Sequence, residues 1–147
     1  MRIAIGCDHG GIVLKPAVIE YLKAKGVEFE DFGTYDTASV DYPIYAKKVA
    51  EAVASGAFDK GILLCGTGIG MSIAANKVKG IRAAVLSDEF SAAACSAHNN
   101  ANILCLGGRV VSPEKATKLV DLWLTTPFEG DRHNRRLAII ADMDERK

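Results

Sequence analysis

The sequence predicts an α/β fold, a Rossmann-like three-layer sandwich with a five-stranded parallel sheet and a C-terminal helix. Two observations predict it. Short apolar runs alternate with helical patterns along the whole chain, and this alternation favours a parallel sheet with helices on both faces. The 147 residues, 49% of them hydrophobic, are enough for one substantial core. We therefore expect residues 1–147 to form a single domain.

The first strand, helix and strand are expected within residues 2–32. Residues 2–7 form an apolar run typical of a buried strand. Residues 12–25 then place apolar side chains at helical spacing, and Gly26 ends this helix. Residues 27–32 alternate in polarity, which indicates a second strand.

A run of turn formers separates these elements from the next helix. Pro43 suits the first turn of a helix, which we expect to end near Ala54. Residues 60–64 are apolar and predict the third strand, and the glycine loop after it leads into a helix that should end near Val78.

The second half of the chain continues the alternation. We expect strands at residues 82–86 and 102–106, with a helix at residues 89–97 between them. The pair Ser112-Pro113, a capping hydroxyl followed by proline, predicts the start of a helix that runs to Leu124. A last helix fits residues 132–143.

Charge and hydropathy exclude several classes of partner. Lys plus Arg and Asp plus Glu each number 18, so no overall field draws the chain to nucleic acid or to an anionic membrane. No apolar stretch approaches the roughly 18 residues of a membrane-spanning helix, and the first residues show a strand pattern rather than a secretory signal. We expect a cytoplasmic protein that acts on small molecules.

The cysteines and histidines predict neither a disulfide framework nor a metal site. The four cysteines, at positions 7, 65, 95 and 105, form no Cys-x-x-Cys pair and fall in expected strands, strand ends and a helix. The three histidines, at positions 9, 98 and 133, lack the close paired spacing of structural zinc sites. Free thiols and no bound metal are expected.

The strongest functional signal is the loop after the third strand, Cys65-Gly66-Thr67-Gly68-Ile69-Gly70. Glycines let the backbone approach a ligand closely, and free amides at the start of the next helix point at whatever is bound. The same helix end favours the thiolate form of Cys65. We interpret the loop as an oxyanion cradle beside a base or nucleophile. The alternative is a tight turn around an inert buried thiol.

This loop does not match the glycine-rich motifs of nucleotide-binding proteins. The dinucleotide pattern needs glycine at position 71 and a cysteine-phosphatase loop needs arginine there, but the residue is Met71. The Gly-Lys pair of the Walker motif is also missing. The loop therefore predicts a binding site of another kind.

Other polar residues follow the carboxyl ends of the expected strands, where ligands of doubly wound sheets bind. The residues that share this position are Asp8, His9, Cys65, Ser87, Asp88 and Arg109. We expect them to lie on one rim of the sheet. For Asp8, a helix cap beside a solvated His9 imidazole is an equally good interpretation.

Two more groups have both a structural and a functional interpretation. His98 and Asn99 stand where a helix should end, and such residues are common there without any site role. Arg132 and Arg136 are four residues apart, so a helix places both guanidinium groups on one face, which suits a phosphate. A solvated basic face is the usual explanation of such a pair. Arg109 near the active rim strengthens the phosphate interpretation.

Seven motifs occur in a characteristic order and spacing over nearly the whole chain. They are Gly6-Cys7-Asp8-His9, Asp41-Tyr42-Pro43, the loop 65–70, Ala74-Ala75-Asn76-Lys77, His98-Asn99, Gly108-Arg109-Val110 and residues 129–136. Together they resemble the ribose-5-phosphate isomerases of type B. The resemblance implies an aldose-ketose isomerase without metal or organic cofactor, whose active sites are built across a homodimer interface.

The resemblance also implies catalytic roles. Cys65 would be the base that moves a proton between C2 and C1 of the open-chain sugar phosphate, through a cis-enediolate. Thr67 would help to shuttle protons between the two oxygens. His98 would open the furanose ring by protonating its oxygen.

Binding roles follow from the same resemblance. The amides of Gly66, Gly68, Ile69 and Gly70, with the side chain of Asn99, would stabilise the enediolate. Asp8 would bind sugar hydroxyls. The expected phosphate ligands are His9, Arg109, Arg132 and Arg136, some of them from the partner subunit.

Two features bear on the substrate. Some family members use a glutamate in the following helix as base, and residues 72–75 contain none, which supports Cys65. Galactose-6-phosphate isomerases divide the site residues between two chains, whereas this chain carries all of them. That favours ribose 5-phosphate as the substrate of a homodimer or tetramer.

Two alternatives remain open at this level. Allose 6-phosphate or another six-carbon aldose phosphate could be the substrate instead, because pocket length depends on packing. A non-catalytic sugar-phosphate-binding domain is the alternative from another class, since one fold serves many functions. A thiol, an imidazole and three arginines together favour the enzyme.

Overall fold

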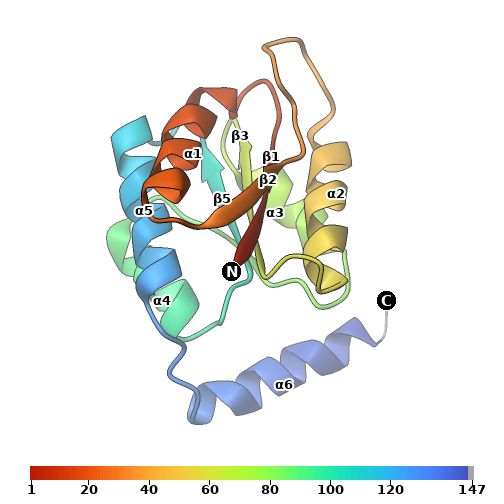
Figure 1. Cartoon of the computed structure of the whole chain (residues 1–147). Helices are drawn as coiled ribbons and strands as arrows, with labels where there is room; N and C mark the ends of the chain where they lie inside the picture. Colours follow the sequence, from red (N-terminus) through yellow and green to blue (C-terminus); the bar gives the residue numbers. More distant parts are fainter. Residues whose placement is uncertain (146–147) are drawn as a thin grey trace.

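The computed structural model describes residues 1–145, which contain a five-stranded sheet in the order β2-β1-β3-β5-β4 (Figure 1). All neighbouring strands are parallel. The strands are β1 (Arg2–Cys7), β2 (Glu28–Asp31), β3 (Lys60–Cys65), β4 (Ala83–Val85) and β5 (Ile103–Gly107). The central strands β1, β3 and β5 are almost entirely buried, as both faces of a parallel sheet are.

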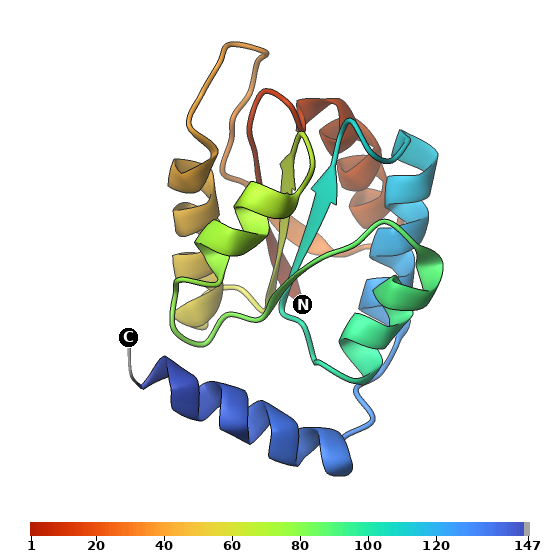
Figure 2. The ribbon, with the colours of Figure 1, turned by 180° about the vertical axis from the view of Figure 1, so that it is seen from behind.

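Helices cover both faces of the sheet. They are α1 (Lys15–Ala24), preceded by the 3₁₀ turn η1 (Ile12–Leu14), α2 (Tyr42–Ala54), α3 (Ile69–Ala75), α4 (Glu89–Ala97), α5 (Pro113–Thr125) and α6 (Arg132–Asp144). The helices α1, α4 and α5 pack on one face, and α2 and α3 pack on the other (Figures 1 and 2). The expected three-layer α/β sandwich is confirmed.

The element boundaries differ from expectation mainly at α3, which ends at Ala75 rather than near Val78. The Asn76 side chain gives a physical reason, because it donates a hydrogen bond to the Ala83 carbonyl (3.0 Å) and accepts one from the Ala83 amide (2.8 Å). Asn76 thus fixes the start of the short edge strand β4 instead of continuing the helix. The expected cap of α5 is confirmed, since the Ser112 hydroxyl accepts a hydrogen bond from the Lys115 amide.

The core beneath α4 and α5 is centred on Trp123, which is fully buried. Its indole Nε1 donates a hydrogen bond to the Ala101 carbonyl (2.9 Å), and its own carbonyl accepts one from the Ser96 hydroxyl (2.6 Å). Trp123 therefore joins α5 to α4 through its main chain and to the segment that leads into β5 through its side chain.

Replacing Trp123 with phenylalanine should lower the free energy of unfolding by about 1–3 kcal/mol, because the Ala101 carbonyl loses this donor and the smaller ring leaves a void. Urea unfolding followed by circular dichroism measures the change. An unfolding midpoint equal to that of the wild type would contradict this description of the core.

The C-terminal helix α6 lies outside the two helical layers, across the end of the molecule from which the strands start (Figures 1 and 2). Its far end is tied to the turn before β4 by a hydrogen bond from the Gly80 amide to Asp144 and by an ion pair between Lys79 and Glu145. Its apolar side chains Ile139, Ile140 and Met143 stay exposed. An exposed apolar helix face of this kind is unusual for a monomer.

Within residues 1–145, no helix combines the length and the apolar character needed to cross a membrane.

Candidate active site

Cys65 is the last residue of β3 and pairs with Gly107 of β5. Its Sγ accepts a hydrogen bond from the Gly68 amide at 3.0 Å, so the loop 65–70 folds back over the sulfur. Gly68 has φ of 81°, a left-handed conformation that favours glycine, and α3 starts directly after it. The chain thus presents a main-chain N–H to the thiol at the carboxyl end of a central strand.

Cys65 is only 5% exposed, but it lines a cavity of about 430 Å³ at this edge of the sheet. The other residues around this cavity are Asp8, Tyr42, Gly66, Thr67, Ile69, Gly70, Ile73 and Arg109. Six of the residues expected to surround Cys65 therefore do so: Asp8, Gly66, Thr67, Ile69, Gly70 and Arg109.

Backbone hydrogen bonds hold the loops that form the cavity. The Gly108 amide donates to the Cys65 carbonyl (2.8 Å), and the Arg109 amide donates to the Gly66 carbonyl (3.0 Å). A Cβ at Gly66 would lie 3.1 Å from Nη1 of Arg109, so glycine lets the guanidinium lie closely over the loop. The positive charge of Arg109 is thereby placed at the mouth of the Cys65 cavity.

Asp8 has both of the roles that the sequence left open. Its Oδ1 accepts hydrogen bonds from the amides of Gly10 (2.8 Å) and Gly11 (3.0 Å), so it caps the turn after β1, and it also lines the cavity. His9 is half-buried beside it, and its Nδ1 accepts a hydrogen bond from the Val40 amide. In the neutral imidazole this bond places the proton on Nε2.

The remaining expected site residues lie at the other end of the sheet. His98 and Asn99 follow the last turn of α4 and precede β5, while Arg132 and Arg136 are exposed on α6. The Glu129 amide donates to the Ala97 carbonyl and so connects the start of the α6 segment to the end of α4. Within one chain, these four residues form a second group, separate from the Cys65 cavity.

Ser87 and Asp88 do not line the Cys65 cavity, although the sequence placed them on the same rim. They border a different hollow along α4, which Asn99 also lines. Asp88 caps α4, because its carboxylate accepts a hydrogen bond from the Ser91 amide (2.8 Å), and this bond lowers the pKa of Asp88. Its role in the fold is structural.

Four residues of the candidate site were not expected from the sequence. Two of them, Tyr42 and Ile73, line the Cys65 cavity. The other two, Glu129 and His133, lie near His98 at the end of α4. The Tyr42 ring packs so closely on Gly70 that a Cβ there would lie 2.5 Å from it. The motif Asp41-Tyr42-Pro43 indicated a helix start, but no local pattern shows that this start lies beside the loop 65–70. Glu129 precedes α6 and His133 lies in its first turn, so no helical spacing in the sequence links them.

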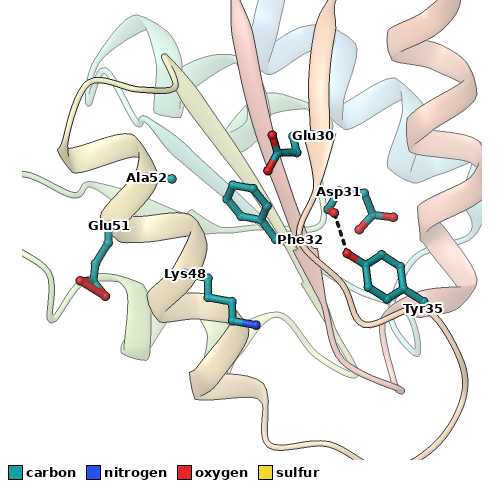
Figure 3. Close-up of a pocket in the computed structure, with 7 residues that line it drawn as sticks. All are labelled: Glu30, Asp31, Phe32, Tyr35, Lys48, Glu51 and Ala52. Carbon is teal, nitrogen blue, oxygen red and sulfur yellow. Dashed lines mark hydrogen bonds between the residues drawn. The ribbon is translucent and has the colours of Figure 1, made fainter.

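A further cavity, of about 500 Å³, lies at the outer edge of the sheet between β2 and α2 (Figure 3). Its walls carry the carboxylates of Glu30, Asp31 and Glu51 but only one cation, Lys48. Asp31 is paired with Lys15, but Glu30 and Glu51 still outnumber Lys48, so the Cys65 cavity with its Arg109 is the better candidate for a phosphorylated ligand.

Comparison with known proteins gives a consistent result. Residues 3–140 match the family model "Ribose/Galactose Isomerase". The chain is 49% identical over 146 residues to ribose-5-phosphate isomerase B of Escherichia coli, an alignment that spans 99% of this chain and 98% of that protein. It is 43% identical to the galactose-6-phosphate isomerase subunit LacB of Clostridium acetobutylicum, over 99% of this chain and 83% of the relative.

Solved structures of the same family are similar to this chain in both sequence and fold. Ribose-5-phosphate isomerase B of Clostridium thermocellum superposes with a TM-score of 0.97 at 51% identity, over 99% of both chains. The enzyme of Mycoplasma genitalium, solved with bound ribulose 5-phosphate, gives a TM-score of 0.95 at 43% identity, over 99% of this chain and 97% of the other. Sequence and structure thus agree along almost the entire length, and the chain belongs to the ribose/galactose isomerase family.

Proposed function

We propose that the chain is a ribose-5-phosphate isomerase, which interconverts ribose 5-phosphate and ribulose 5-phosphate as one domain spanning residues 1–147. The observation that carries this proposal is the Cys65 sulfur, which accepts a main-chain hydrogen bond and faces a cavity lined by Asp8, Thr67 and Arg109. Relatives named as ribose-5-phosphate isomerase B, one of them with ribulose 5-phosphate bound, support the choice of substrate.

The proposed chemistry needs a base and a cradle for negative charge. Cys65 takes the proton from C2 of the open-chain aldose, which leaves a cis-enediolate, and returns it to C1 to give the ketose. In the proposed enzyme the amides of the loop 66–70 stabilise the enediolate oxygens, although the Gly68 and Ile69 amides donate in this structure to the Cys65 sulfur and the Thr67 hydroxyl. Thr67, whose Oγ1 accepts a hydrogen bond from the Ile69 amide, moves the proton between the two oxygens.

Ring opening and phosphate binding require the second group of residues. In the proposed enzyme His98, Asn99, Arg132 and Arg136 of one chain complete the Cys65 cavity of another, so a single chain has no complete site. His98 donates the proton that opens the furanose ring. His9 and Arg109 bind the phosphate together with the two arginines of the second chain.

Exposed apolar side chains support a homodimer with such shared sites. Ile69 and Ile73 on α3 border the Cys65 cavity and are 54% and 59% exposed. Ile139, Ile140 and Met143 on α6 are exposed as well. Apolar side chains are thus exposed on α3, beside one group of site residues, and on α6, beside the other, where a second copy would bury them.

The direct test mixes purified protein with ribose 5-phosphate and a chelator and follows ketose formation, with allose 6-phosphate and galactose 6-phosphate as parallel substrates. We expect turnover of ribose 5-phosphate with the highest kcat/KM of the three, unaffected by the chelator. Preference for a six-carbon sugar would support the alternative substrate class. Binding without turnover of any sugar would contradict the proposed function.

A further inference from the structure

Three side chains at the junction of α4 and α6 form a cluster, His98, Glu129 and His133, which we call the histidine cluster. One Glu129 oxygen lies 3.6 Å from Nε2 of His133, and the other lies 3.9 Å from Nε2 of His98. The two imidazole rings stack with their centroids 4.6 Å apart. Each residue offers one ligand atom, and these three atoms all lie within 4.8 Å of one another.

His133 is the second observation that points to a ligand. Its side chain is buried, and among the described residues its Nε2 is a buried polar atom without a hydrogen-bond partner. A buried nitrogen of this kind costs free energy unless something satisfies it. An imidazole nitrogen is a common metal ligand in proteins.

We propose that the histidine cluster binds a transition-metal ion of the zinc class, through one nitrogen of each imidazole and one Glu129 oxygen. Zinc bonds to nitrogen and carboxylate oxygen of about 2.0–2.2 Å place tetrahedral ligands about 3.3–3.5 Å apart. The Glu129 oxygens lie 3.6 and 3.9 Å from the two nitrogens, close to this separation, but the stacked imidazole rings, whose planes are 15° apart, must turn before both nitrogens face one ion. Water would occupy the open position, because the cluster supplies three ligands.

The ligand atoms select the type of ion, since the positive charges of Arg132 and Arg136 on the same helix oppose every cation alike. Calcium and magnesium bind through charged oxygen ligands, of which the cluster offers one residue, and are disfavoured. Zinc, cobalt and nickel form strong bonds to imidazole and suit two histidines and a carboxylate.

Metal binding at this cluster has a consequence that rests on the proposed function. The ion would bind the nitrogen of His98 that otherwise carries the proton for ring opening, so His98 could not act as the acid. It would also fix His98 against Glu129, away from a substrate. The cluster is then an inhibitory site, distinct from any cofactor requirement of the isomerase.

The binding test uses the full-length metal-free protein and Co²⁺ as a visible probe, with Zn²⁺ as competitor. We expect one ion per chain with the d–d absorption of a tetrahedral site, displaced by Zn²⁺. His133→Gln and Glu129→Gln should each weaken binding by at least about tenfold, while Glu20→Gln, an exposed glutamate of α1, should not. Thermal melting checks that each variant is folded. Equal binding by the wild type and by either cluster variant would overturn the proposal, as would no binding by the wild type.

The activity test separates this inference from the proposed function. Zn²⁺ should inhibit the wild type and Glu20→Gln alike, whereas half-inhibition of His133→Gln, measured against that variant's own metal-free turnover, should need at least about tenfold more Zn²⁺. Equal inhibition of His133→Gln would place the inhibitory ion elsewhere, at Cys65 for example, and would overturn the regulatory part. If the wild type binds Co²⁺ at the cluster but turns over no sugar phosphate, the metal site stands and the proposed function fails.

Discussion

Replacing Cys65 with alanine is expected to lower kcat by about 10²- to 10⁴-fold while KM changes little. A general base contributes about this much to proton transfer, and the sulfur is the only side-chain group of Cys65 that the change removes. The residues proposed to bind the sugar and the phosphate stay in place, so ground-state binding should persist. Steady-state kinetics with ribose 5-phosphate measure the two constants.

Cys95→Ala is the matched control. Cys95 is also a buried thiol at 5% exposure, but it lies in α4 and takes no part in the Cys65 cavity. Its loss should leave kcat within a factor of about two, because an alanine-rich helix accommodates another alanine. Near-normal turnover of a folded Cys65→Ala protein would exclude the thiol as the base.

The sequence patterns predicted the fold well because they act locally. Each central strand is a run of apolar residues that both helical layers bury, so its pattern is unambiguous. Ser112 and Pro113 likewise mark the start of α5 through their own chemistry. The least accurate boundary, the end of α3, depends on a contact between Asn76 and the distant Ala83.

The spatial division of the candidate site was harder to foresee. The position of Cys65, Asp8 and Arg109 after parallel strands placed them on one rim, and they line one cavity. His98 precedes its strand rather than following it, which puts it at the opposite end. Only the family resemblance, which implies a homodimer with shared sites, connected the two groups, because contacts between chains leave no local sequence pattern.

Long-range contacts of single polar residues also escape sequence reasoning. A lysine at the start of a helix, such as Lys15, is usually exposed to solvent. Lys15 is instead buried. It forms an ion pair with Asp31 at 2.9 Å and donates a hydrogen bond to the Thr34 carbonyl. The partners are 16 and 19 residues away, across the turn after β2. Periodicity reports which face of a helix is apolar but not which charge finds a buried partner.

Two inactive variants should restore activity when they are combined in one dimer. If His98 serves the Cys65 cavity of the other chain, a dimer of one Cys65→Ala chain and one His98→Ala chain contains one site with both defects and one intact site. Random mixing makes half of the dimers mixed, so activity should recover to about a quarter of the wild-type value. Refolding the two variants separately and together, and then measuring turnover, gives the comparison.

The matched control refolds Cys65→Ala with the double variant Cys65→Ala/His98→Ala. No combination of these two chains contains Cys65, so activity should stay at the level of the single variant. Recovery in the first mixture but not in the second requires that the thiol and the imidazole come from different chains. If neither mixture recovers although native mass spectrometry shows mixed dimers, then Cys65 and His98 of the same chain must work together. In that case α4 would have to approach the Cys65 cavity within one subunit, against the separation of the two groups at opposite ends of the sheet.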